Sequence, residues 1–131
     1  MKNILIVDDE AVIRLDISEI LKESNHKIFS SESSEKAIEI LTNNQIDIVF
    51  LDFHLGTGPD GLNVLKTVKD MDKDIEVVMI TGDGGSNLID ECVELGVHNF
   101  IKKPYKSDDI LICTQISSKL RDRNLEYRAK D

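Results

Sequence analysis

Short runs of apolar residues alternate along this chain with segments of helical apolar spacing, and this alternation strongly constrains the fold. Residues 4–7, 48–51 and 77–80 contain no polar side chain. Runs without in/out alternation are typical of parallel strands that are covered on both faces of a sheet. Residues 97–101 form a shorter candidate strand, and residues 27–30 form a weaker one that suits the edge of a sheet.

Apolar residues recur at helical spacing in the segments that follow these candidate strands. The five sets are Ile13, Ile17, Ile20 and Leu21; Ala37, Ile38 and Leu41; Val64, Leu65 and Val68; Ile89, Cys92 and Val93; and Ile112, Ile116 and Leu120. Ser33 or Ser34 is expected to cap the second helix, and Gly96 to end the fourth. Five β–α units in sequence predict an α/β fold, a doubly wound parallel sheet with helices on both faces.

Composition narrows the class of protein. The chain has 131 residues and a net charge of −9, which argues against direct nucleic acid binding by this chain. It has no apolar run of membrane-spanning length and no signal peptide pattern, so we expect a cytoplasmic protein. Cys92 and Cys113 are expected to be free core thiols. We expect one domain over residues 1–120, and in 121–131 a charged extension of the last helix or the start of a linker.

Chemically useful side chains follow the candidate strands. Asp8 and Asp9 follow the first apolar run, Asp52 the second, Thr81 the third, and Lys103 the last candidate strand. Active sites of such folds lie at the carboxyl ends of the strands. Clustered carboxylates repel one another, and a Mg²⁺ ion bound by oxygen ligands removes that conflict. The set therefore suits phosphoryl transfer to Asp52, with Lys103 as a second positive charge and Thr81 as a hydrogen-bond donor.

Each feature alone is more typical of a helix start, a turn or a surface loop, but together they resemble a known family. Residues 4–10, Asp52, Thr81 and the pair Lys103-Pro104 are similar to the motifs of the receiver domain of two-component response regulators, over nearly the whole chain. This resemblance implies a flavodoxin-like (βα)5 fold with strand order 2-1-3-4-5. It also implies that Asp52 is the phosphoacceptor.

The resemblance further implies a metal site and a lysine with a defined position. Asp9 and Asp52 would bind Mg²⁺ directly, Asp8 mainly through water, and the backbone carbonyl of His54 would complete the protein ligands. The bond before Pro104 would be cis. Lys103 matches the family lysine, and its neighbour Lys102 is expected to be a surface charge.

A signalling role follows from the same resemblance. The donor would be a phosphohistidine on a sensor histidine kinase or a histidine phosphotransfer protein. Thr81 would move toward the phosphoryl group, and Phe100 would turn inward and reshape the surface of the fourth helix, last strand and fifth helix. That surface would control a downstream effector, with the chain a monomer or a phosphorylation-linked dimer. The side chains of His54 and Asp83 are expected to tune the lifetime of the phosphoryl group.

Two other classes of function stay open from the residues. A haloacid-dehalogenase-type phosphatase also uses an aspartyl-phosphate, but His54 stands where that class has a second acid. A protein-interaction module without phosphorylation is the other. We expect no enzyme activity beyond autocatalytic phosphorylation and self-dephosphorylation.

Overall fold

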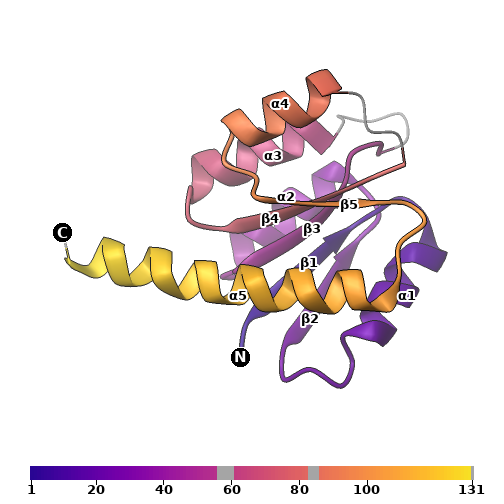
Figure 1. Cartoon of the computed structure of the whole chain (residues 1–131), viewed down its shortest axis with the longest axis horizontal. Helices are drawn as coiled ribbons and strands as arrows, with labels where there is room; N and C mark the ends of the chain where they lie inside the picture. Colours follow the sequence, from indigo (N-terminus) through magenta and orange to yellow (C-terminus); the bar gives the residue numbers. More distant parts are fainter. Residues whose placement is uncertain (56–60, 83–85, 131) are drawn as a thin grey trace.

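A single parallel sheet forms the centre of the molecule (Figure 1). The computed structural model describes residues 1–55, 61–82 and 86–130. Its five strands lie in the order β2-β1-β3-β4-β5 and are all parallel. The strands are β1 (Asn3–Val7), β2 (Lys27–Ser31), β3 (Ile48–Asp52), β4 (Glu76–Thr81) and β5 (Asn99–Lys102). The helices are α1 (Ala11–Ile20), α2 (Ser34–Asn43), α3 (Gly61–Met71), α4 (Ser86–Glu94) and α5 (Ser107–Lys130).

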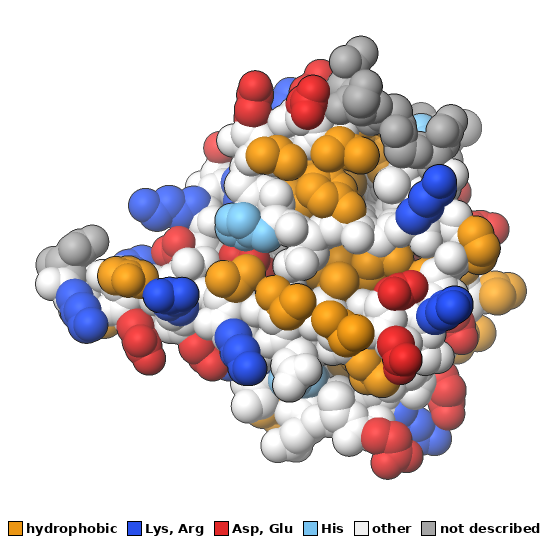
Figure 2. Space-filling model, in the orientation of Figure 1, with side chains coloured by type: hydrophobic (Ala, Val, Ile, Leu, Met, Phe, Trp, Pro, Cys, Tyr) orange, Lys and Arg blue, Asp and Glu red, His pale blue; other side chains and the backbone are white. Residues whose placement is uncertain are grey.

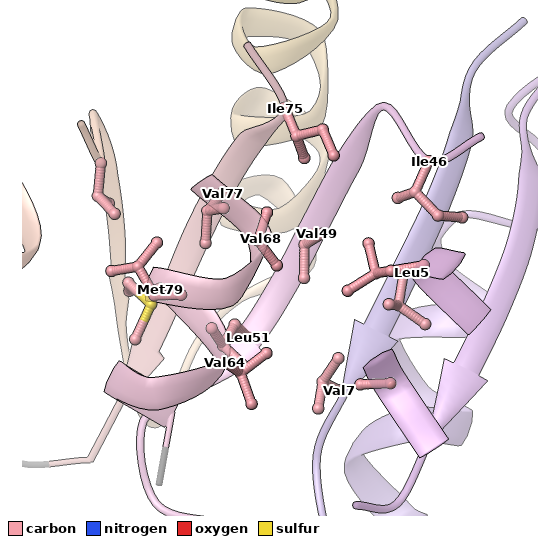
Figure 3. Packing of buried hydrophobic residues seen from close by; sticks show 14 of the residues in the cluster. Leu5, Val7, Ile46, Val49, Leu51, Val64, Val68, Ile75, Val77 and Met79 are labelled. Carbon is pink, nitrogen blue, oxygen red and sulfur yellow. The ribbon is translucent and has the colours of Figure 1, made fainter. Parts of the chain in front are cut away.

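This topology confirms the predicted flavodoxin-like fold, with β2 at the expected edge. Alternate side chains of each strand point to opposite faces of the sheet. Leu5 and Val7 belong to one buried cluster, together with residues of α2, α3 and α4 (Figure 3). Ile4 and Ile6 belong to a second cluster, together with residues of α1 and α5. Each face of the sheet thus carries a layer of helices. This explains why the central strands have apolar side chains on both faces.

Local signals at the helix ends agree with the sequence. Ser33 is the N-cap of α2, where its hydroxyl accepts a hydrogen bond from the backbone N–H of Lys36 at 3.2 Å. Gly96, just after α4, has a φ of 94°, the left-handed conformation that glycine adopts without strain. The peptide bond between Lys103 and Pro104 is cis.

The orientation of α5 differs from the expectation that the apolar side of a helix packs against the sheet. Its apolar stripe does not face the sheet, because Ile112 is 54% exposed and Ile116 is 43% exposed. The buried residues of this helix are Ile110, Thr114, Ser117 and Arg121. Thr114 satisfies its buried hydroxyl by donating to the carbonyl of Ile110 at 2.7 Å. Small polar side chains thus lie among the buried residues of α5, while Ile112 and Ile116 face outward.

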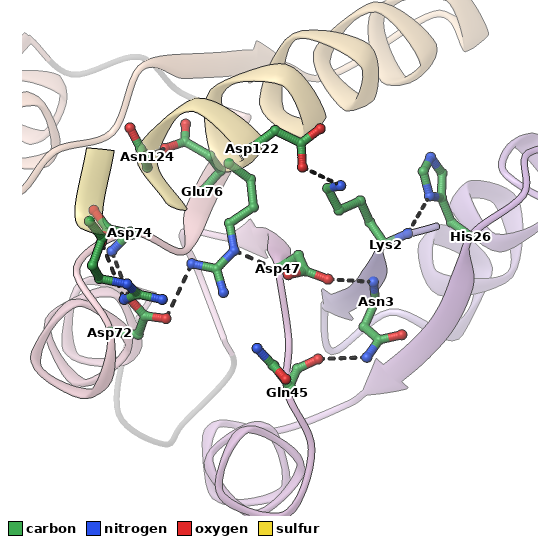
Figure 4. A network of polar contacts seen from close by, with 12 residues as sticks. Lys2, Asn3, His26, Gln45, Asp47, Asp72, Asp74, Glu76, Asp122 and Asn124 are labelled. Atoms are coloured by element: carbon green, nitrogen blue, oxygen red, sulfur yellow. Dashed lines mark hydrogen bonds and ion pairs between the residues drawn. The ribbon is translucent and has the colours of Figure 1, made fainter. Parts of the chain in front are cut away.

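A network of polar contacts that includes Asp47 and Asp72 holds the C-terminal half of α5 (Figure 4). The predicted boundary between residues 120 and 121 falls inside this helix. Arg121 is fully buried, with Nε 3.1 Å from Asp47 Oδ1 and Nη1 3.2 Å from Asp72 Oδ2. Asp47 precedes β3 and Asp72 precedes β4, so this network lies at the amino ends of the strands, opposite the predicted site. No helix in the described ranges is both long and apolar enough to span a membrane.

Candidate functional site

Four of the predicted site residues stand where parallel strands end at one edge of the sheet. Asp8 directly follows β1, Asp52 is the last residue of β3, and Thr81 is the last residue of β4. Lys103 directly follows β5, and its backbone N–H donates to the carbonyl of Thr81 at 2.8 Å. The strand register therefore brings together residues that are far apart in the sequence.

The ammonium group of Lys103 lies among carboxylates. Its Nζ is 3.5 Å from Asp8 Oδ2, 3.5 Å from Asp52 Oδ1 and 3.7 Å from Glu10 Oε2. Lys102, in contrast, is exposed. Lys103 is thus a shared counter-ion for this edge of the sheet.

Burial makes the carboxyl groups of Asp8 and Asp52 costly to ionise. It raises the pKa of Asp8 to about 6, although the N–H of Glu10 opposes the shift. Burial also raises the pKa of Asp52, against the opposing effects of Lys103 and the His54 N–H. Burial alone would lower the pKa of Lys103, but Asp52, Asp8 and Glu10 together raise it. One ammonium therefore compensates these acids only in part.

The acidic residues after β1 have the chemistry of a divalent cation site. One carboxylate oxygen each from Asp8, Asp9 and Glu10 lies within 4.8 Å of the others. Asp8 Oδ2 is buried and accepts no hydrogen bond from the part of the chain that the structure describes. Carboxylate oxygens are the donors that Mg²⁺ prefers, so these residues fit that ion. Sequence reasoning did not single out Glu10, although it adjoins the two predicted ligands.

The backbone around Asp52 is tightly packed. The N–H of His54 donates to Asp52 Oδ1 at 3.3 Å, and the His54 side chain is exposed. A Cβ atom on Gly61, the first residue of α3, would lie 2.6 Å from the carbonyl oxygen of Asp52. Only glycine fits this contact, and the sequence offered no signal for it. Asp83, the other predicted tuning residue, lies outside the described residues.

Comparison with known proteins identifies the family. The family model "Response regulator receiver domain" matches residues 4–115. This chain belongs to the response regulator receiver family. That membership supports a phosphorylation-controlled signalling switch as its class of function.

The match to this chain covers different shares of the individual relatives. The chain is 34% identical over 109 residues to sporulation initiation phosphotransferase F of Bacillus subtilis, covering 83% of this chain and 87% of that protein. It is 30% identical over 132 residues to a putative response regulator NtrX-like of Rickettsia bellii, covering 98% of this chain but 28% of that protein. The structure of NtrX from Brucella abortus in complex with ADP has a TM-score of 0.91 at 27% identity, over 99% of this chain and 30% of that one.

The predicted switch residue of this receiver lies between its core and its surface. Phe100 of β5 is half-buried and packs against the cluster that contains Val77 and Met79. It also lines a groove of about 320 Å³ together with Ile112 and Cys113 of α5. Figure 2 shows hydrophobic side chains along α5 and on the surface near α4 and β5. A change in Phe100 packing can therefore reach an exposed apolar surface.

Proposed function

We propose that this receiver accepts a phosphoryl group on Asp52 from a phosphohistidine, in a Mg²⁺-dependent reaction, and then alters its α4-β5-α5 surface to control an output. The observation that carries the proposal is the environment of Asp52. Asp52 is 4% exposed at the end of β3, and the Lys103 ammonium lies 3.5 Å from its carboxylate. An Asp52 oxygen would attack phosphorus as the bond to the histidine nitrogen breaks, and the imidazole would leave.

The residues of the site have separate roles in this proposal. Asp9 and Asp52 would hold Mg²⁺, with Asp8 acting through water and the His54 carbonyl as a further ligand. When bound, the ion would offset negative charge on the phosphoryl oxygens. Lys103 would pair with the phosphoryl group once it is attached. Thr81, 9% exposed at the end of β4, would donate its hydroxyl to a phosphoryl oxygen.

The response to phosphorylation would pass through packing. Movement of Thr81 would let Phe100 turn inward, away from the groove on the α5 side. Phe100 has no hydroxyl, so it would change only the shape of the α4-β5-α5 surface. Self-dephosphorylation would end the signal without other enzyme activity, at a rate that the side chains of His54 and Asp83 tune.

The donor would be a sensor histidine kinase or a histidine phosphotransfer protein that docks on α1. Val12 is 75% exposed and Leu15 is 71% exposed on this helix, which begins directly after the Asp8–Glu10 cluster. Exposed apolar side chains beside a reactive site are typical of a protein docking surface. A downstream effector would bind the α4-β5-α5 surface, and the protein would act in the cytoplasm as a monomer or a phosphorylation-linked dimer.

Intact mass spectrometry after incubation with acetyl phosphate and Mg²⁺ tests the proposal. The wild-type chain should gain one phosphoryl mass, and Asp52→Asn or added EDTA should abolish the gain. Asp70→Asn, at an exposed position on α3, is the matched control and should still be modified. Absence of an adduct with any donor would favour an interaction module. Hydrolysis of many phosphomonoesters would favour a phosphatase.

A further inference from the structure

A hydrogen bond joins the segment after Lys103 to the helix after the acidic cluster. The hydroxyl of Tyr105 donates to Asp16 Oδ2 at 2.6 Å, between residues that are 89 positions apart. Tyr105 stands two residues after Lys103, and Asp16 lies on α1. The contact therefore links the two segments that carry the positive and the negative sides of the site.

Both segments are also anchored to the strand ends. The backbone N–H of Lys103 donates to the carbonyl of Thr81 at 2.8 Å. On the α1 side, Arg14 Nη1 donates to the carbonyl of Asp8 at 2.7 Å. The ring of Tyr105 is half-buried and packs against the cluster formed under α1 and α5. The packing of the Tyr105 ring thus holds its hydroxyl in position.

We propose that Tyr105 is a positioning residue for Lys103, an inference that rests on the proposed function. The hydrogen bond to Asp16 holds segment 103–106 against α1. This fixes the Lys103 ammonium 3.5 Å from both Asp8 Oδ2 and Asp52 Oδ1. Within the described residues the hydrogen bond of Tyr105 goes to Asp16 and not to Asp8 or Asp52, so Tyr105 would act through the lysine.

Near-equal distances make the site sensitive to small displacements. If segment 103–106 moved away from α1, the ammonium would lose contact with Asp8 or Asp52. A misplacement of about 1 Å can cost up to about 100-fold in rate, so a partial displacement is expected to cost about 5-fold. The hydroxyl of Tyr105 is thus expected to matter for rate more than for folding.

Removing single hydroxyl groups tests this role. Tyr105→Phe keeps the packed ring and loses the hydrogen bond, and it should slow phosphorylation of Asp52 by acetyl phosphate about 5-fold. Tyr127→Phe removes the other tyrosine hydroxyl, on an exposed part of α5, and should not change the rate. Asp16→Ala should match Tyr105→Phe, and the double variant should be no slower than either single one.

A second cycle separates positioning from a merely structural effect. In a Lys103→Ala background, Tyr105→Phe should cause no further loss of rate, because the residue that it positions is gone. A 5-fold loss that persists there would overturn the proposal, as would a wild-type rate in Tyr105→Phe.

One readout needs no phosphoryl transfer. The ¹³Cε resonance of Lys103, assigned by its absence in Lys103→Arg, should shift in Tyr105→Phe and not in Tyr127→Phe. An unchanged resonance would overturn the positioning role even if Asp52 is phosphorylated. Failure of wild-type Asp52 to take phosphate would instead overturn the proposed function.

Discussion

Lys103 Nζ lies 3.5 Å from Asp8 Oδ2, a buried oxygen that accepts no hydrogen bond within the described part of the chain. The ammonium is half-buried and is shared with Asp52 and Glu10. Burial raises the pKa of Asp8 to about 6, and the Glu10 N–H and Lys103 offset that effect only in part. This imbalance gives the metal-free protein a stability that depends on pH.

Asp8→Asn should stabilise the metal-free protein at neutral pH. The pKa of Asp8 is raised from 3.8 to about 6 on folding, so the folded state binds more protons than the unfolded state between these values. Stability from this group is present at low pH and is lost as pH rises through 4 to 6. Asn cannot ionise and avoids this loss, which is worth about 3 kcal/mol above pH 7.

Urea denaturation in EDTA measures this difference. The variant and the wild type should have nearly equal free energies of unfolding at pH 4, and should diverge in favour of Asp8→Asn by pH 7.5. Adding Mg²⁺ at pH 7.5 should raise the stability of the wild type more than that of the variant. A wild type that is more stable than Asp8→Asn in EDTA at pH 7.5 would refute the assignment.

Gly61→Ala should destabilise the fold at the base of the site. The added Cβ would meet the Asp52 carbonyl oxygen at 2.6 Å and the Phe53 Cα at 2.8 Å, both backbone atoms that cannot turn aside. We expect a loss of about 2 kcal/mol, typical of overpacking. Gly82→Ala is the matched control, because a Cβ there meets no atom within 4 Å. Thermal unfolding of both variants decides, and equal melting temperatures would contradict the close contact at Gly61.

Leu15→Ser should separate protein donors from small donors. If a phosphohistidine protein docks on the exposed apolar face of α1, losing Leu15 should slow transfer from that protein by about 10-fold. Phosphorylation by acetyl phosphate should not change, because Leu15 does not touch the site. Ile116→Ser, on the exposed face of α5, should leave both rates as in the wild type. Equal slowing with both kinds of donor would show that Leu15 affects the site rather than docking.

The fold was predictable because its signals are local. The strands β1, β3 and β4 each contain an unbroken apolar run, and Ser33 and Gly96 mark helix ends through chemistry within a few residues. The position of the site followed from topology, since parallel strands end at one edge. Asp8 and Asp52 could therefore be placed together although 43 residues separate them in the sequence.

The orientation of α5 was not predictable from periodicity. An apolar stripe indicates that a helix is amphipathic, but it does not say which side the sheet covers. In α5 the sheet covers Thr114 and Ser117, and leaves Ile112 and Ile116 in water. An exposed apolar stripe is typical of a helix that binds another protein. The helix whose apolar stripe does not face the core is therefore part of the surface proposed to bind the effector.

Side-chain pairs between distant segments could not be predicted from the sequence either. The Tyr105–Asp16 hydrogen bond and the Arg121–Asp47 ion pair join residues 89 and 74 positions apart. Neither pair belongs to a motif, and charged residues near the C-terminus are typical of a solvated helix. Only the packing of α5 on the sheet reveals that Arg121 is part of the core.

Arg121→Ala should destabilise the protein far more than the same change at its exposed neighbour Arg123. Arg121 is fully buried between Asp47 and Asp72, and its removal leaves both carboxylates without this partner. Losing one side of a buried ion pair typically costs about 3–5 kcal/mol. Arg121→Met fills the same space without the charge and should still be costly, because Asp47 and Asp72 each lose an ion pair, although Asp72 keeps Arg128. Urea denaturation at pH 7.5 should rank Arg123→Ala near the wild type and Arg121→Ala lowest, and a loss below about 1 kcal/mol for Arg121→Ala would mean that the pair does not anchor α5.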